Sequence, residues 1–119
     1  MEPNLRRKVT DEKIDRLVQV VKQLRLQKRE MSAQELATLF YIGSRHDCHK
    51  TALEEDLNFT TASSSRNTDK LSKVHRLGTA GYDLIVKEIE EEPPRRQRLK
   101  LTKKGEDLMN QIKQILYGS

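Results

Sequence analysis

Residues 51–74 have the sequence TALEEDLNFTTASSSRNTDKLSKV, in which two short amphipathic segments flank a break. Thr51 and Glu54 have the spacing of a capping box, in which each side chain accepts a hydrogen bond from the other residue's backbone amide. This pattern predicts a helix over 52–57. Asn58–Phe59 then interrupts the apolar periodicity. The region is therefore predicted to contain two helices joined by a tight turn.

The second of these helices has the side chains needed to enter a DNA groove. Thr60 or Thr61 is expected to cap it, and it should reach about Lys73 with Ala62 and Leu71 as its apolar contacts. Small hydroxyl side chains allow close approach of the backbone, while arginine pairs with guanine and asparagine with adenine. We therefore predict a helix-turn-helix over 51–74. The residues predicted to contact DNA from it are Thr60, Thr61, Ser63, Ser64, Ser65, Arg66, Asn67, Lys70, Lys73 and Arg76.

A β-hairpin is predicted after this motif, over 82–102. Residues 82–89 read as a strand with Leu84 and Val86 on one face, and 98–101 alternate as a return strand. The connecting loop contains two prolines, which cannot continue a strand ladder. Its arginines suit the narrow minor groove, whereas its three glutamates would repel phosphate unless they pair within the hairpin or point away. The arginines predicted to contact DNA are Arg95, Arg96 and Arg98.

Both ends of the chain are predicted to be amphipathic helices. Thr10 is expected to cap a helix over 10–28, and Thr102 a helix over 103–117. A capping box of Ser32 and Glu35 opens a further helix that is expected to reach about Ser44. The order helix, helix, helix, helix, strand, strand, helix predicts a mainly α protein with a small β-hairpin (α+β), arranged as a winged helix-turn-helix. We expect a basic arm over 1–9 and a single domain over 10–117.

The composition favours a partner chain and a polyanion. Of 119 residues, 34% are hydrophobic and 34% are charged. The hydrophobic fraction is low for a core that one chain completes alone. The net charge of +5 is unevenly placed, since 95–104 carry six basic residues and no acid, and 60–76 carry four basic residues and one acid. Pairing the apolar stripes of the terminal helices across a two-fold axis would complete the core. We therefore expect a homodimer that binds double-stranded DNA.

Several other classes of protein are disfavoured. The single cysteine excludes an intrachain disulfide, and His46–His49 holds metal-capable residues too close together to converge on one ion. No nucleophile–base set, paired carboxylates or phosphate-binding glycine loop is present, so we predict neither catalysis nor a cofactor. No apolar run could cross a bilayer, and the basic N-terminus lacks a signal-peptide core, which predicts a cytoplasmic protein.

The residues of two motifs resemble the MarR-like winged-helix family. One is 51–67, within the predicted helix-turn-helix, and the other is 98–106, which is similar to the family's return strand and leucine-threonine-x-x-glycine helix start. The segment 71–78 resembles phage-encoded members, which would place the protein in a host cytoplasm near the nucleoid. The family's acid-then-arginine wing signature is replaced here by Glu92-Pro93-Pro94-Arg95. The resemblance implies a homodimer held by its terminal helices, with recognition helices in successive major grooves and a wing arginine in the minor groove.

Together these patterns predict a sequence-specific transcriptional regulator that binds double-stranded DNA. One alternative is a DNA-organising or replication or recombination accessory protein with little sequence preference. The other is a winged-helix adaptor that binds protein, which the acidic base of the hairpin would suit. A small-molecule effector is compatible with the resemblance, but no residue pattern indicates one.

Overall fold

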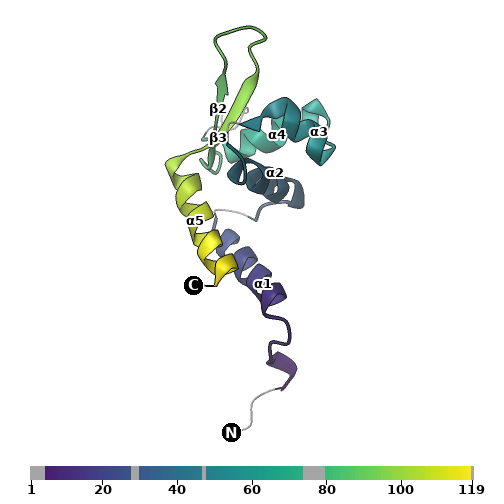
Figure 1. Cartoon of the computed structure of the whole chain (residues 1–119), viewed down its shortest axis with the longest axis vertical. Coiled ribbons are helices and arrows are strands. Elements are labelled where there is room, and N and C mark those ends of the chain that lie inside the picture. The colour runs from purple at the N-terminus through teal and green to yellow at the C-terminus, as the bar shows by residue number, and fades with distance from the viewer. Residues whose placement is uncertain (1–4, 28–29, 47, 74–79, 119) are drawn as a thin grey trace.

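The structure of the protein, a computed structural model, describes residues 5–27, 30–46, 48–73 and 80–118. Within these ranges, five α-helices, one 3₁₀ helix and three short strands follow one another, which confirms the predicted α+β class (Figure 1). The elements in chain order are η1 (Leu5–Arg7), α1 (Glu12–Leu24), α2 (Ala33–Gly43), β1 (Cys48–His49), α3 (Lys50–Leu57), α4 (Thr61–Leu71), β2 (Ile85–Ile89), β3 (Gln97–Leu101) and α5 (Lys103–Tyr117).

Side-chain caps determine where four of the α-helices begin. The Asp11 carboxylate accepts hydrogen bonds from two amides of the first turn of α1. At α2 the predicted capping box is confirmed, because Ser32 and Glu35 each accept from the other's backbone N–H at 3.1 Å. Thr60 caps α4 and Thr102 caps α5 in the same way, through their hydroxyl oxygens. Each cap satisfies amide groups that have no partner within the helix.

Two of the predicted helix starts are wrong. The cap of α1 is Asp11 rather than Thr10, and the helix is shorter than predicted. The capping box expected of Thr51 and Glu54 does not form, because α3 already begins at Lys50. Glu54 instead accepts a hydrogen bond from the Lys50 ammonium one turn earlier, at 2.7 Å.

The three strands form an antiparallel sheet in the order β1-β3-β2. The hairpin was predicted, and its register pairs Ile85 with Leu101. Strand β1 was not predicted; it has two residues and pairs Cys48 with Leu99 on the other edge of β3. A two-residue strand has no alternation to detect, so the sequence carries no signal for it. Strand β1 therefore anchors the hairpin to the segment between α2 and α3.

The predicted strand over 82–89 is wrong in its start and its phase. Asp83 has a left-handed backbone (φ 58°), which interrupts the extended chain, and β2 begins only at Ile85. Ile85 is 1% exposed, whereas Val86 is 39% exposed and faces outward. Leu84 is fully buried but precedes the strand. The apolar run therefore contains a change of direction that alternation alone does not show.

The segment that leads into β2 is hydrogen-bonded to the C-terminal end of α4. A side chain at Gly81 would collide with this backbone, because a Cβ atom there would lie 1.9 Å from the Ser72 carbonyl oxygen. The contacts satisfy carbonyl groups that the end of a helix leaves open, and they fix the wing relative to α4. The amides of Gly81, Tyr82, Asp83 and Leu84 donate to the carbonyls of Lys73, Lys70, Ser72 and Leu71, over 2.8–3.1 Å.

The molecule is elongated, with extents of 66 × 27 × 26 Å. Its radius of gyration is 16.8 Å, against about 13.5 Å for a compact domain of this length. Helices α2, α3 and α4 pack around the sheet, while α1 and α5 lie side by side and extend away from it (Figure 1). In the part of the chain that the structure describes, no helix has the length and apolar character required to span a membrane.

Candidate nucleic-acid interface

One face of α4 is buried against the rest of the domain. Ser64, Asn67, Thr68 and Leu71 recur at helical spacing, and each is at most 6% exposed. The prediction that Ser64 and Asn67 lie on the outer face is therefore wrong. The Asn67 side chain donates to the amide oxygen of Gln34 on α2, at 3.1 Å. These two polar side chains form hydrogen bonds within the domain, Ser64 with Glu54 and Asn67 with Gln34.

The opposite face of α4 is open. Thr61, Ala62 and Arg66 are exposed, and Lys73 is exposed just beyond the helix. With 3.6 residues per turn, positions 62 and 66 lie within about 30° of the direction opposite to the buried stripe. Ala62 was predicted to point inward, but nine residues separate it from Leu71, which places it on the other side of the helix. The remaining predicted residues are Thr60, which is exposed, and Ser63, Ser65 and Lys70, which are half-buried.

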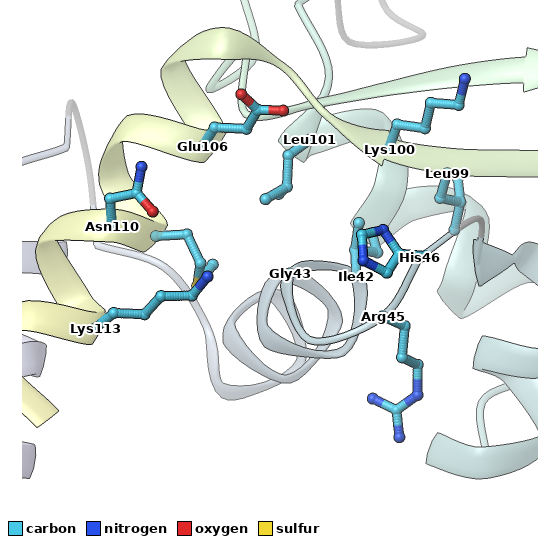
Figure 2. A pocket seen from close by; sticks show the side chains of 11 residues that line it. Ile42, Gly43, Arg45, His46, Leu99, Lys100, Leu101, Glu106, Asn110 and Lys113 are labelled. Carbon is cyan, nitrogen blue, oxygen red and sulfur yellow. The ribbon is translucent and has the colours of Figure 1, made fainter. Parts of the chain in front are cut away.

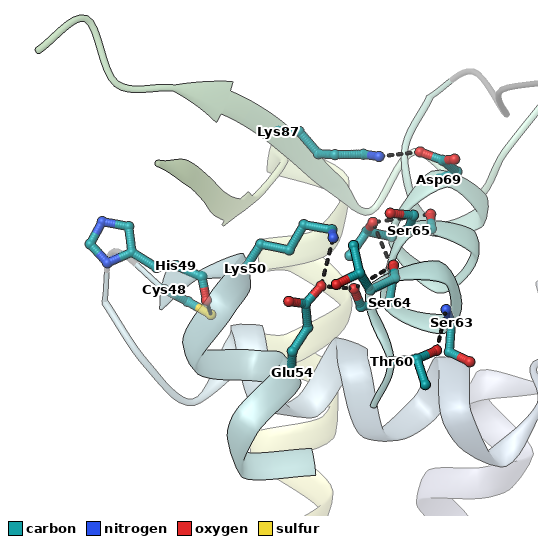
Figure 3. A network of polar contacts seen from close by, with 12 residues as sticks. Cys48, His49, Lys50, Glu54, Thr60, Ser63, Ser64, Ser65, Asp69 and Lys87 are labelled. Atoms are coloured by element: carbon teal, nitrogen blue, oxygen red, sulfur yellow. Dashed lines mark hydrogen bonds and ion pairs between the residues drawn. The ribbon is translucent and has the colours of Figure 1, made fainter. Parts of the chain in front are cut away.

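A network of polar contacts joins α3 to the buried face of α4 (Figure 3). The Glu54 carboxylate accepts hydrogen bonds from the Lys50 ammonium and from the Ser64 hydroxyl. The side chains of Lys50 and Glu54 are only 11% and 15% exposed. Burial raises the pKa of Glu54, but the hydrogen bonds from Lys50 and Ser64 and the lysine charge outweigh it, so that the pKa lies below its ordinary value. The ionised carboxylate therefore fixes the two helices relative to each other.

We expect Glu54→Gln to destabilise the protein by about 1–3 kcal/mol at pH 7, the range for hydrogen bonds to a charged group. Because the folded-state pKa of Glu54 is lowered, its contribution is present above its ordinary pKa of 4.5 and is lost as the pH falls through the lowered value. Urea unfolding of wild type and variant at pH 7 and pH 3 measures the difference in their free energies of unfolding. The difference between wild type and variant should shrink at pH 3, whereas Glu55→Gln, on the exposed side of α3, should have little effect at either pH.

The tip of the hairpin presents two arginines to solvent. Arg95 and Arg96 are exposed, and the left-handed backbone of Arg95 (φ 56°) reverses the loop, closed by a hydrogen bond from the Glu90 amide to the Arg96 carbonyl. Among the described residues, no ion pair or hydrogen bond involves either guanidinium group. Arg98, farther back on β3, is half-buried and takes part in a contact within the chain. Arg95 and Arg96 are therefore the arginines of the wing most available to a ligand.

The acidic base of the wing is partly neutralised within the sheet. The Glu90 carboxylate lies 2.6 Å from Nε2 of His49 on β1, and Glu88 pairs with Lys100 at 3.0 Å. Glu91 and Glu92 are exposed. The partner of Glu90 is a histidine on a strand that was not predicted, so sequence reasoning could not identify it.

A further ion pair links the wing strand to α4. Lys87 of β2 binds the carboxylate of Asp69, and the two side chains are 26% and 15% exposed (Figure 3). Asp69 is the acid on the outer half of α4, where an unpaired carboxylate would repel a phosphate backbone. Lys87 therefore masks that charge and joins the two parts of the predicted interface. This residue was missed, because a lysine within a strand carries no signal of its partner.

The helix α4 and the wing lie at one end of the molecule, and α1 extends toward the other (Figure 1). The structure therefore brings Thr60, Thr61, Arg66, Lys73, Arg95 and Arg96 to the same end, with the half-buried Ser63, Ser65 and Lys70 beside them. Arg76 lies outside the described residues. The arrangement gives an open helix and an arginine-tipped loop that could face one ligand.

The end away from the wing carries an uncovered apolar stripe. Ile14, Leu17, Val18 and Val21 of α1 recur at helical spacing and are 46–58% exposed. The neighbouring face of α1 packs on α5, where the Arg16 guanidinium donates to the Leu116 carbonyl at 3.0 Å. The packing of α1 on α5 therefore leaves this stripe exposed to water. The exposure is unfavourable in proportion to the apolar area of the stripe.

A cavity of about 430 Å³ lies between α2, β3 and α5 (Figure 2). Its lining includes Arg45, Lys100 and Lys113, with His46 beside them and Glu106 as its acid. Two of these cations are already engaged, because Lys100 pairs with Glu88 and the Arg45 guanidinium lies 3.7 Å from the centre of the Tyr41 ring.

Among the described residues between α2 and α3, Cys48 was the candidate for a reactive group. Cys48 is 5% exposed, and burial raises the pKa of its thiol, so it is protonated at neutral pH. Among the described residues, no group of three histidine, cysteine, aspartate or glutamate side chains is placed to hold a metal ion.

Solved structures share this architecture. The DNA complex of MepR from Staphylococcus aureus aligns with 90% of this chain and 77% of its own, with a TM-score of 0.65 and 17% sequence identity. The chain has a MarR-like winged-helix fold. A MarR transcriptional regulator from Methanosarcina mazei Go1 gives a TM-score of 0.60 at 15% identity, over 90% of this chain and 64% of its own. The PcaV regulator from Streptomyces coelicolor, in complex with its natural ligand, gives 0.54 at 16% identity, over 99% and 84%.

The likeness to MarR-like proteins lies in the three-dimensional arrangement. The sequence matches no protein-family model, and no curated protein matches it significantly. The helix-turn-helix corresponds to α3 and α4, the wing to β2 and β3, and both were predicted from local sequence patterns.

Proposed function

We propose that the protein is a homodimeric, sequence-specific regulator of transcription that binds double-stranded DNA. The observation that carries this proposal is the open face of α4 beside the arginine-tipped wing, at the end of the molecule away from the apolar stripe. The MarR-like fold supports it, since the neighbours named above are transcriptional regulators. Because the ligand is genomic DNA, of a cell or a phage, we place the protein in the cytoplasm with the nucleoid. The activity is binding without catalysis.

Helix α4 enters the major groove in this proposal. Its first turn carries Thr61 and Ala62, which are small enough for the backbone to approach the base edges. Arg66, one turn later on the same face, is long enough to pair with guanine O6 and N7. Lys70 and Lys73 contact phosphates and give affinity without sequence information.

The wing lies along the adjacent minor groove. A narrow minor groove has an enhanced negative potential, which favours insertion of the Arg95 and Arg96 side chains. The ion pair between Glu88 and Lys100 at the base of the wing reduces the repulsion that the acidic segment would otherwise create.

The apolar stripe of α1 is the dimer interface in this proposal. Pairing the stripes of two chains buries Ile14, Leu17, Val18 and Val21 and relates the two α4 helices by a two-fold axis. A dimer of this kind reads two half-sites separated by about one helical turn, roughly 34 Å.

Selection of bound duplexes from a random-sequence pool tests the proposal. We expect the purified protein to enrich a near-palindromic site, and footprinting of the selected DNA should protect two half-sites one turn apart. Binding without enrichment would favour a DNA-organising or accessory protein. Absence of binding at low salt would favour a protein-binding adaptor, in which the exposed Glu91 and Glu92 would take part.

The affinity for DNA is expected to fall steeply with salt, and the double substitution Arg95→Ala/Arg96→Ala should flatten that dependence. Each phosphate contact contributes about −0.9 to the slope of log affinity against log salt, so removal of four wing arginines per dimer should reduce its magnitude by about 3 to 4. Titrations between 50 and 300 mM salt measure the slopes. As a control of opposite charge, Glu91→Gln/Glu92→Gln should strengthen binding. An unchanged slope in the arginine variant would remove the wing from the interface.

A further inference from the structure

The exposed surface of α4 contains one apolar side chain, that of Ala62. It lies on the stripe opposite to the buried face, one turn before Arg66. Its two neighbours in the first turn, Thr61 and Ser63, are polar. Thr61 is exposed, and the backbone amide of Ser63 donates to the Thr60 hydroxyl at 3.1 Å. The Ala62 methyl group therefore faces outward without a partner within the chain and without any capacity to form a hydrogen bond.

Two other small side chains of the helix are engaged within the domain. The Ser64 hydroxyl donates to Glu54, and the Thr68 hydroxyl donates to the Ser64 carbonyl at 2.8 Å. Arg66 approaches the Ser63 hydroxyl at 3.4 Å, which keeps its guanidinium near the first turn. The outward surface at the start of α4 thus combines the Ala62 methyl group and the Arg66 guanidinium group with the exposed side chains of Thr60 and Thr61.

We propose that Ala62 determines specificity by contacting the C5-methyl group of a thymine. This inference rests on the proposed function, and it names a base that the interface selects. Of the four bases, thymine is the one that presents a methyl group in the major groove. An exposed alanine methyl can therefore make an apolar contact with it. A cytosine at the same position lacks this group and offers only a hydrogen-bond donor, which alanine cannot accept.

The spacing of the two side chains restricts where this thymine lies. Four helical residues rise by about 6 Å, and successive base pairs are about 3.4 Å apart. The thymine contacted by Ala62 is therefore expected within about two base pairs of the guanine contacted by Arg66, in each half-site.

Replacement of single thymines by deoxyuridine in the selected site tests the proposal, because it removes only the methyl group. We expect one thymine per half-site at which deoxyuridine weakens wild-type binding by about fourfold, the fold-change for loss of one buried methyl or methylene group. The Ala62→Gly variant should bind the thymine and deoxyuridine duplexes equally. Ala33→Gly, in the exposed first turn of α2, is the matched control and should retain the wild-type preference.

The outcomes separate this inference from the proposed function. Should wild-type protein enrich a site but tolerate deoxyuridine at every thymine, the contact is absent while the regulator remains. Retention of the full deoxyuridine penalty by Ala62→Gly would assign the methyl contact to another residue and overturn the inference. Failure of the wild type to enrich any sequence would overturn the proposed function, and this inference with it.

Discussion

Substitution of Val18 by Asp is expected to convert the protein from a dimer of about 28 kDa into a 13.9 kDa monomer. Val18 is 49% exposed within one chain, on the side of α1 away from α5. In the proposed dimer the new carboxylate would be buried without a partner, which costs several kcal/mol. Sedimentation equilibrium at micromolar concentration measures the mass. The fold of the single chain should persist, because the substituted position already faces solvent there.

The same substitution should weaken binding to a near-palindromic site by about 100-fold or more, because linked binding of two half-sites gains 10²–10⁴ over one. Gln19→Asp provides the matched control, since Gln19 is exposed on the polar side of the same helix. It should leave both mass and affinity unchanged. A Val18→Asp protein that stays dimeric would show that the stripe is not the interface, and a wild-type monomer would remove the dimer from the proposal.

Arg66→Ala is expected to cost about 1–3 kcal/mol in binding to the selected site and to flatten the sequence preference, as for loss of a bidentate arginine–guanine pair. Arg66 is exposed on the outer stripe of α4, so its removal leaves the packing of the helix intact. Fluorescence titrations with the selected duplex and with a scrambled duplex measure the two affinities. The loss should be confined mainly to the selected duplex.

Arg25→Ala controls for the loss of one positive charge. Arg25 is 64% exposed and pairs with Glu30, in the connection after α1 and away from α4. It should change neither affinity nor preference appreciably. Equal losses of affinity for the selected and scrambled duplexes in Arg66→Ala would assign Arg66 to a phosphate and leave base reading to other residues.

Local patterns were sufficient for most elements of the fold. Capping residues and helical periodicity are properties of a few neighbouring residues, so the box at Ser32 and the caps at Thr60 and Thr102 could be predicted. The end of α3 was also visible, because Asn58 adopts the left-handed conformation (φ 56°) that asparagine tolerates.

The errors concern the direction in which polar residues face. A run of serines has no apolar periodicity, so Ser64 and Asn67 could not be separated from Ser65 and Arg66 by composition. Leu71 could have predicted the buried face of the helix, since residues three, four and seven positions before it lie on the same face. Applied to α4, this spacing places Asn67, Thr68 and Ser64 inward and leaves Ala62 outside.

The amino-acid sequence by itself determined the order of the α-helices, the caps at Ser32, Thr60 and Thr102, the presence of the hairpin and the two basic segments, because each depends on interactions between residues close together in the chain. Only the tertiary structure decided which cations remain available to a ligand, since Glu54, Asp69 and Glu90 find their partners on other elements. It also decided that α5 leaves one stripe of α1 uncovered. Such pairings depend on how elements pack across distances that no local pattern encodes.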